Sequence, residues 1–349
     1  MTLVDLGSLS LPELTIFVAG LGEKPYRSKQ IYRWMHQQGA VDFDQMTDLS
    51  KDLRQKLREN SGLPLLTKDL DQKSADGTIK FRFRTYDGHA IESVYMPSED
   101  RKTLCVSTQV GCAMGCGFCM TATLGLKRNL SAWEIVAQVH AVNLEIRRNE
   151  GLELRRPLTN LVFMGMGEPL HNFENLKKAL LILKSEDGPQ FSHRHITVST
   201  VGLVPMIARF GAETDVKLAI SLNASNDEQR SRLMPINKKW NLVSLMAACR
   251  KFPLRQGRRI TFEYVMMKGV NDADEDAARL IKLLGDIPAK VNLIPYNENP
   301  GLEFSSSDEN RANAFRELLA KGRVSAFVRK NRGRDIAAAC GQLANQPLQ

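Results

Sequence analysis

The sequence predicts an α/β protein, in which a closed or partly closed barrel of strands and helices follows a small helical domain and a β-hairpin. Three observations predict this fold. Short β-rich runs alternate with helical runs from residue 103 onward, apolar residues recur at helical spacing within residues 11–60, and residues 80–84 alternate between basic and aromatic side chains. At 349 residues the chain is long enough to bury a barrel-sized core.

Composition limits the classes of function. The net charge is +9 and the pI is near 9.3, which favours a polyanionic partner such as RNA but also fits an ordinary solvated surface. Residues 1–30 contain no basic start followed by an apolar run, and no stretch is apolar enough to span a membrane. We therefore expect a soluble, cytoplasmic protein, whose six cysteines are ligands or reactive thiols rather than structural bridges.

Residues 1–75 are predicted to form the helical domain. Two helical runs flank the break at residues 20–22, and the apolar positions in them are Leu14, Phe17, Val18, Ile31, Trp34 and Met35. Arg27, Lys29 and Arg33 lie near that break. They suit contacts to RNA phosphates, and they suit the solvated face of a packing domain equally well.

Residues 76–100 are predicted to form a β-hairpin extension. Its strands are 80–84 and 91–96, and Asp87-Gly88 supplies the turn. Lys80, Arg82 and Arg84 would form a basic strip on which RNA could lie. Glu92 falls on an otherwise apolar strand face, where a carboxylate is either paired or functional.

Residues 101–349 are predicted to form the barrel. The strand candidates are 103–109, 159–164, 195–200, 215–222, 259–267, 290–295 and 324–329, with helices between them. The first of these helices starts at Ala132, where Ser131 and Glu134 form a capping box. Such alternation predicts a parallel sheet with helical crossovers, whose active site lies at the carboxyl ends of the strands.

Small and polar residues follow several of these strands. They are Gly165 to Pro169, Ser199-Thr200, Ser221 to Asn223, and Tyr296-Asn297. A lone G-x-G is a weak signal, most often a turn. Here it recurs on the same predicted rim as a cysteine-rich loop, so we expect all of these residues to converge on one mouth.

That loop, Gly111 to Thr121, has the sequence G-C-A-M-G-C-G-F-C-M-T. Cys112, Cys116 and Cys119 have C-x3-C-x2-C spacing, and three thiolates at such intervals suit three corners of an iron–sulfur cluster. No fourth Cys or His lies nearby, so one iron would stay open to another ligand. A zinc loop and chance placement are the alternatives, and both fit an open three-thiolate loop poorly.

The triplet resembles that of the radical S-adenosylmethionine (SAM) superfamily, which implies that SAM fills the open position on a 4Fe-4S cluster. Nearly the whole chain resembles the dual-specificity rRNA and tRNA adenine-C2 methyltransferases, the RlmN type. The motifs that carry this resemblance are I-E-S-V-Y-M-P at 91–97, L-C-V-S-T-Q-V-G-C at 104–112, G-M-G-E-P at 165–169, M-P-I-N-K-K at 234–239 and D-I-A-A-A-C-G-Q-L at 335–343. The fold implied is a partial (β/α)6-type radical SAM barrel.

The resemblance also implies a two-stage reaction that uses two SAM molecules per turnover. Cys340 takes a methyl group from the first, and a 5′-deoxyadenosyl radical from the second removes hydrogen from that methyl. The carbon then adds to C2 of adenine, Glu92 takes the C2 proton, and Cys105 releases the RNA by forming a disulfide with Cys340. From the residues alone, Cys105 and Cys340 would read as packing residues.

The SAM contacts implied by the resemblance are Gly167, Glu168, Ser199, Ser221, Leu222, Asn223 and Asn297. The common family form has His in place of Asn223. An amide can also donate to a ribose hydroxyl, so we expect Asn223 to keep a SAM contact. An Asn223→Ala variant with unchanged SAM affinity would contradict this.

The implied RNA partners are 23S rRNA, at its peptidyl-transferase centre, and tRNA, at adenosine 37. An electron donor such as flavodoxin is also implied. The enzyme is expected to be a monomer. The basic runs Arg255–Arg259 and Arg329–Arg334 would contact RNA phosphates or simply be solvated. The nearest alternative function is methylation of adenine C8, as in the chloramphenicol/florfenicol resistance methyltransferases. A non-catalytic iron–sulfur RNA-binding protein and a radical SAM enzyme acting on protein or a metabolite belong to different classes.

Overall fold

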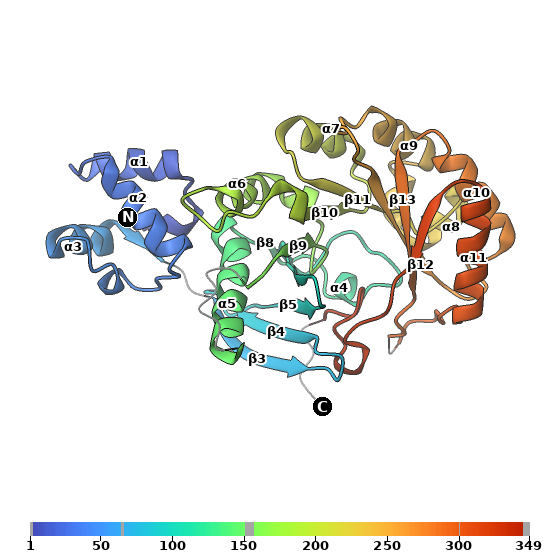
Figure 1. Ribbon diagram of the computed structural model, residues 1–349, viewed down its shortest axis with the longest axis horizontal. Helices are drawn as coiled ribbons and strands as arrows, with labels where there is room; N and C mark the ends of the chain where they lie inside the picture. The colour runs from blue at the N-terminus through green and yellow to red at the C-terminus, as the bar shows by residue number, and fades with distance from the viewer. Residues whose placement is uncertain (1–2, 64–65, 151–156, 300, 345–349) are drawn as a thin grey trace.

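The computed structural model of the protein describes residues 3–63, 66–150, 157–299 and 301–344. Residues 1–2 of the first predicted domain lie outside the described residues. So do residues 345–349 of the third. Figure 1 shows a group of helices at one end of the molecule, joined to a long curved sheet with further helices along its outer side.

The group at the end consists of α1 (Leu11–Gly20), α2 (Tyr26–His36) and α3 (Lys51–Asn60). Strand β1 (Val4–Asp5) pairs in parallel with β2 (Ser61–Gly62) and so closes the segment on itself. Ser10 caps α1 in a capping box with Glu13. The helices predicted within residues 11–60 are present, and their apolar faces belong to the same buried cluster as the barrel core.

Ten of the described strands form one sheet in the order β14-β13-β12-β11-β10-β9-β6-β5-β4-β3. The strands from β14 to β6 are parallel and the last three are antiparallel. Their bounds are β3 (Thr67–Lys73), β4 (Ile79–Arg84), β5 (Ala90–Pro97), β6 (Lys102–Cys105), β9 (Asn160–Phe163), β10 (Ile196–Thr200), β11 (Lys217–Ser221), β12 (Ile260–Met266), β13 (Ala289–Pro295) and β14 (Ser325–Val328). Among these strands the edges β14 and β3 are not paired with each other, so the barrel is only partly closed.

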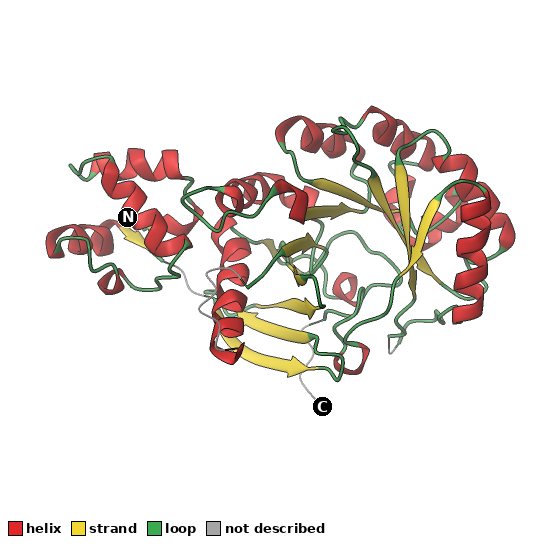
Figure 2. Cartoon of the chain, viewed as in Figure 1, coloured by secondary structure: helices red, strands yellow, loops and turns green. Residues whose placement is uncertain are grey.

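Helices cover the outside of the sheet (Figure 2). They are α5 (Ala132–Glu150), α6 (Phe173–Lys184), α7 (Val204–Glu213), α8 (Asp227–Leu233), α9 (Leu242–Lys251), α10 (Asp274–Leu284) and α11 (Glu309–Lys321). The short 3-10 helices are η1 (Leu6–Ser8), η2 (Phe43–Gln45), η3 (Pro169–Asn172), η4 (His193–His195), η5 (Pro235–Lys238) and η6 (Arg334–Ile336). The one-turn helix α4 (Met120–Thr123) instead lies within the curve of the strands (Figure 1). None of the described helices is long and apolar enough to cross a membrane.

Two expectations about the strands need correction. The candidate 103–109 is two strands, because the ladder is interrupted at Ser107, whose amide donates to Gln138 Oε1 at 2.9 Å instead of to a neighbouring strand. The basic strip on β4 is not an open surface, since Lys80 is buried and Arg82 and Arg84 both pair with Asp69. Asp69 lies on β3, a strand that the sequence did not reveal.

Candidate active site

One cavity lies at the carboxyl ends of the parallel strands. Nine of the predicted site residues line it: Cys112, Cys116, Cys119, Gly167, Glu168, Ser199, Ser221, Asn223 and Cys340. Glu92, Cys105, Leu222 and Asn297 do not line it. The residues predicted from separate strand ends therefore do converge on one mouth.

The cysteine loop leaves strand β7 (Gln109–Val110), which pairs with β8 (Arg128–Asn129) and so fixes both ends of the loop side by side. Gly111 has φ +74°, and a Cβ there would meet the carbonyl oxygen of Gly125 at 1.8 Å. Only glycine fits this approach. The tight closure directs the segment that carries the three cysteines into the cavity.

The three thiols fit an iron–sulfur cluster. None of them is in a disulfide, and burial together with the neighbouring Cys119 and Cys112 raises the pKa of the Cys116 thiol well above its usual value. Three partly buried cysteines that face one cavity would need a cationic centre to bind as thiolates. Among the described residues no group of three His, Cys, Asp or Glu side chains is arranged around a single ion. A 4Fe-4S cluster binds one thiolate at each of three separate irons, so its cysteine ligands stand further apart than the ligands of a single metal ion.

Glu168 forms the wall beside the cluster loop. Its side chain is buried, with Oε1 accepting from the amide of Leu170 at 3.0 Å and Oε2 from the amide of Val201 at 2.9 Å. Burial raises the pKa of this carboxyl to about 7, although these hydrogen bonds oppose the rise. Gly167, at φ +96°, lets the backbone pass so close to Gln109 that a Cβ would meet the Gln109 side chain at 2.5 Å.

The next two strands bring Ser199 and Ser221 together, with their hydroxyl oxygens 3.3 Å apart. Asn223 adopts φ +56°, a left-handed conformation that Asn tolerates better than most residues. Its Oδ1 accepts from the amide of Val265 at 2.9 Å, while its Nδ2 faces only the sulfur of Met234 at 3.4 Å. Leu222 is fully buried, and both of its backbone groups are used, by Glu263 and Arg230.

Arg230 of α8 supports this wall from behind. Its side chain is completely buried and donates to the backbone carbonyls of Val201, Ser221 and Leu222, all of which follow or end strands β10 and β11. Nη1 also donates to Asn237. Sequence reasoning missed Arg230, because nothing local distinguishes it from the solvated arginines of other helices.

Cys340 lies on a segment that we call the strap, residues 329–344, which crosses between β14 and the β3–β4 turn. Cys340 is exposed and lines the cavity. Burial within the surrounding protein and the nearby Glu263 raise the pKa of its thiol to about 11. Asn297 holds the Cys340 carbonyl oxygen at 3.3 Å, and Oδ1 of Asn297 is buried without a partner among the described residues. That unpaired oxygen is an acceptor available to a ligand's hydroxyl or amino group.

Glu92 and Cys105 reach the strap from the hairpin side. Glu92 Oε2 accepts from the amide of Ala344 at 3.0 Å, and Lys80 Nζ lies 3.6 Å from Glu92 Oε1. Cys105 is buried on β6, and burial and the neighbouring Cys340 raise the pKa of its thiol. Both predicted partners of Cys340 therefore lie behind the cavity lining and beside the strap.

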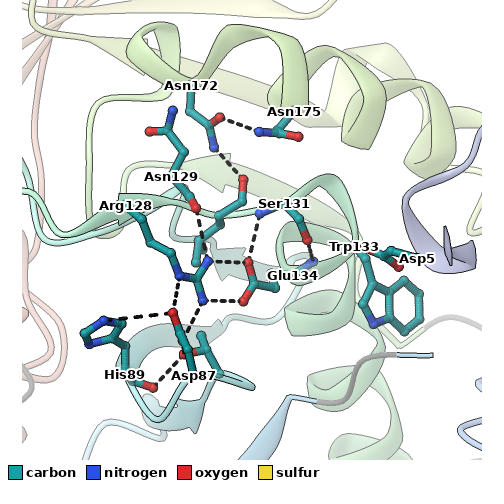
Figure 3. Close-up of polar contacts among 12 residues, drawn as sticks. Asp5, Asp87, His89, Arg128, Asn129, Ser131, Trp133, Glu134, Asn172 and Asn175 are labelled. Carbon is teal, nitrogen blue, oxygen red and sulfur yellow. Dashed lines mark hydrogen bonds and ion pairs between the residues drawn. The ribbon is translucent and has the colours of Figure 1, made fainter. Parts of the chain in front are cut away.

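A charged network ties the hairpin to the cysteine loop (Figure 3). Arg128 donates to both oxygens of Asp87 at 2.6 and 2.8 Å and to both oxygens of Glu134 at 2.8 Å each. The guanidinium holds the pKa of Asp87 well below its usual range. Because Arg128 pairs with Val110 just before the cysteines, this network fixes the hairpin turn against the mouth of the cavity.

Three comparisons with known proteins all match this chain to RNA methyltransferases or to the radical SAM superfamily. Residues 4–62 match the family model for the ribosomal RNA large subunit methyltransferase N-terminal domain, and residues 106–281 match the radical SAM superfamily.

Two curated relatives are especially similar. A dual-specificity RNA methyltransferase RlmN 2 from Myxococcus xanthus is 72% identical over 99% of this chain and 91% of its own. One from Anaeromyxobacter dehalogenans is 61% identical over 97% and 91%. Among solved structures, a radical SAM methyltransferase from Sphaerobacter thermophilus superposes with a TM-score of 0.92 at 47% identity, covering 97% of this chain and 99% of that one.

Proposed function

The chain belongs to the RlmN family of radical SAM methyltransferases, and we propose that it methylates C2 of adenosine in 23S rRNA, at the peptidyl-transferase centre, and adenosine 37 of tRNAs. Its cofactors are a 4Fe-4S cluster and SAM. The observation that carries the proposal is the single cavity, which gathers the three cluster cysteines, the SAM wall and Cys340.

Cys112, Cys116 and Cys119 would hold the cluster, and Glu168, Ser199, Ser221 and Asn223 would hold SAM. When bound, the reduced cluster supplies the electron that cleaves SAM to a 5′-deoxyadenosyl radical. Asn297 positions the Cys340 carbonyl and keeps an acceptor toward the ligand. Leu222 would contribute to SAM binding through packing behind the wall or through its carbonyl, which accepts one hydrogen bond from Arg230 and can accept a second.

Cys340 delivers the methyl carbon to the adenine ring. Its thiol takes a methyl group from SAM, and after losing one hydrogen that carbon adds to adenine C2. Glu92 then accepts the C2 proton, because it is a buried carboxylate next to the strap. Cys105 attacks the Cys340 sulfur and a disulfide forms. The C–S bond to the RNA-bound carbon breaks, and that carbon takes a proton to become the methyl group, while the one electron left by the radical addition would return to the cluster. The closeness of Cys105 to Cys340 and the absence of a disulfide at either support this last role.

RNA must present its target adenosine at the mouth, unstacked from its neighbours. Of the two basic runs, Arg329–Arg334 lies on the strap beside the cavity. The run Arg255–Arg259 precedes β12 and so lies at the opposite end of the strands, with Arg258 and Arg259 donating to Asp215 and Ser325. Tyr86 is a better rim candidate: it is 73% exposed at the hairpin turn and lies under the Arg128 guanidinium.

The proposal assigns residues 1–75 to an RNA-binding accessory domain, residues 76–100 to a hairpin extension, and residues 101–349 to the barrel with its catalytic strap. The enzyme would act as a cytoplasmic monomer that receives electrons from a donor such as flavodoxin.

The test is anaerobic reconstitution with iron, sulfide, SAM and rRNA or tRNA, followed by mass spectrometry of the nucleosides and of the peptide carrying Cys340. We expect 2-methyladenosine together with a methylated Cys340. Formation of 8-methyladenosine would assign the chain to C8 chemistry, and the lack of any methylated base would contradict the proposal. The variants Cys112→Ala, Cys116→Ala and Cys119→Ala should each abolish the product.

A further inference from the structure

Two charged residues of the hairpin hold the strap on both sides of Cys340. Nζ of Lys80 donates to the carbonyl oxygen of Ala337 at 3.3 Å. Oε2 of Glu92 accepts from the amide of Ala344 at 3.0 Å. These hydrogen bonds join the hairpin to the strap three residues before and four residues after Cys340. The hairpin therefore fixes both ends of the short segment that carries the thiol.

The same two residues also contact each other. Nζ of Lys80 lies 3.6 Å from Oε1 of Glu92, and the two side chains are 10% and 2% exposed. Lys80 of β4 pairs in the register with Val94 of β5, and Glu92 lies two residues before Val94. Such diagonal neighbours on an antiparallel pair share one face of the sheet. Lys80 and Glu92 therefore form a buried ion pair that faces the strap.

The strap has a second attachment that involves neither of these side chains. The amide of Met120 donates to the carbonyl oxygen of Gly341 at 2.8 Å. The hydroxyl of Thr121 donates to the carbonyl oxygen of Leu343 at 2.6 Å. Both donors belong to α4, which begins directly after the last cysteine of the cluster loop. Without Lys80, this attachment would still keep the thiol of the strap beside the cluster loop.

The proposed reaction needs the base and the carbon carrier in a fixed arrangement. The carbon on Cys340 adds to adenine C2, and Glu92 accepts the proton of the same C2 atom. Both groups must therefore reach one atom of the base in the same complex. A buried carboxylate also needs a partner charge if it is to accept a proton in its ionised form. Lys80 meets both needs, because it contacts Glu92 and the strap at once.

We propose that Lys80 is a positioning residue for the removal of the C2 proton, which keeps the carboxylate of Glu92 ionised and fixes it relative to Cys340. In this step the C2–H bond breaks and an O–H bond forms on Glu92. The C–H electron pair returns to the ring, and the unpaired electron left by the radical addition goes to the cluster. Lys80 keeps its own protons and acts through Glu92 and the Ala337 carbonyl.

This inference rests on the proposed function, and it is tested first by following the two stages of the reaction separately in Lys80→Met. Methylation of Cys340 by SAM, read by mass spectrometry of its peptide, should stay within about twofold of wild type, because α4 still holds the strap. RNA methylation by the reduced, cluster-loaded protein should fall about 100-fold, with RNA retained as a covalent adduct. Denaturing electrophoresis of labelled RNA measures the adduct. Equal slowing of both stages would make Lys80 a general structural residue and overturn the proposal.

Two further variants separate the charge of Lys80 from its packing. Lys80→Arg restores a cation and should regain at least about tenfold of the RNA methylation lost in Lys80→Met. A Lys80→Arg protein as slow as Lys80→Met would contradict the role of the charge. Arg84→Met is the matched control, because it removes a cation of the same strand that pairs with Asp69, and at saturating RNA it should behave as wild type.

The last measurement asks whether Lys80 acts through Glu92. Added to Glu92→Gln, the Lys80→Met change should leave the remaining rate of adduct release within about twofold, since the carboxylate that it serves is already gone. A further loss of about tenfold would show that the two residues act independently, which is incompatible with the proposal. If the wild-type protein formed neither methylated Cys340 nor an RNA adduct, the proposed function itself would fail.

Discussion

Arg230 shows how a single buried side chain can hold a binding wall in place. Its guanidinium satisfies three backbone carbonyls and one amide oxygen with no water contact. Burial lowers its pKa to about 10, which still leaves it charged at neutral pH. The carboxyl ends of β10 and β11, which carry Ser199 and Ser221, depend on this one cation.

We therefore expect Arg230→Leu to lower the free energy of unfolding by about 3 kcal/mol, because several buried acceptors lose their donor. SAM affinity should fall with it. Arg232→Leu is the matched control on the same helix: its side chain is 62% exposed, pairs with Glu303 and lies over the Phe304 ring, so the loss should stay below about 1 kcal/mol. Urea denaturation of the two variants measures the difference, and equal losses would contradict the role of Arg230.

We expect Glu168 to make SAM binding depend on pH. Its folded-state pKa, about 7, is raised above the ordinary 4.5, so its contribution to stability is complete below about pH 4.5 and is lost as pH rises through 7. Bound SAM should reverse this, because its positively charged amino group would favour the ionised carboxylate. The ratio of wild-type to Glu168→Gln affinity for SAM should therefore rise about tenfold from pH 6 to pH 8. Equilibrium dialysis measures it, and a constant ratio would exclude a direct electrostatic contact.

At the scale of elements, the strap depends on a clip at the β3–β4 turn. The amide of Gly333 donates to Asp76 at 3.0 Å, and Asp335 accepts from the Ser74 hydroxyl at 2.6 Å. Burial raises the pKa of Asp76, but hydrogen bonds from Thr78 and Gly333 outweigh it and hold the pKa at about 2. The lowered pKa means that this contribution is present above about pH 3.8 and is lost as pH falls through 2.

The double variant Asp76→Ala/Asp335→Ala should release the strap. We expect faster hydrogen exchange in residues 329–344 and RNA methylation slowed roughly tenfold, because a mobile strap misplaces Cys340. Asp69→Ala is the control, since Asp69 pairs with Arg82 and Arg84 on the same sheet without touching the strap. Unchanged exchange in the double variant would show that the clip is dispensable.

The sequence predicted the parallel strands from β9 to β14 within two residues at each end, because each is an apolar run bounded by helical or turn residues. Strand β3 escaped prediction, since T-K-D-L-D-Q-K lacks an apolar face and is ordered mainly by pairing with β4. The split between β6 and β7 was equally hidden. It depends on Gln138, a residue of α5 more than thirty positions away, and local periodicity contains no trace of such a partner.

Across the whole molecule, residue patterns by themselves predicted the part of the site with short spacing, whereas Cys105 and Cys340 were named only through the family resemblance. The three cysteines lie within eight positions, and the strand-end residues follow recognisable apolar runs. Arg230 and Glu263 belong to the same site, but their environment comes from strands brought together by the fold. A buried arginine or glutamate looks like a surface residue until its neighbours are known.

The helical end of the molecule is attached to the barrel through a histidine pair. His36 of α2 is buried and His140 of α5 is half-buried, with Nδ1 of His36 3.3 Å from Nε2 of His140, and Trp133 packs against both rings. Burial lowers the pKa of His140 to about 4, and burial and the neighbouring His140 lower that of His36 well below 6.5. Both rings are therefore neutral in the docked state.

A lowered histidine pKa stabilises the fold above about pH 6.5, and this stability is lost as pH falls toward the folded-state value. Acidification from pH 7 to pH 5 should cost about 2 kcal/mol through His140 alone and should loosen α1–α3 from α5. Thermal unfolding and Trp133 fluorescence at the two pH values measure the effect. The double variant His36→Phe/His140→Phe should lose this acid sensitivity, whereas His195→Phe, at an exposed position, should keep it. Equal acid sensitivity in the double variant and the wild type would mean that the acid response arises elsewhere, because the double variant has no protonatable ring at this contact.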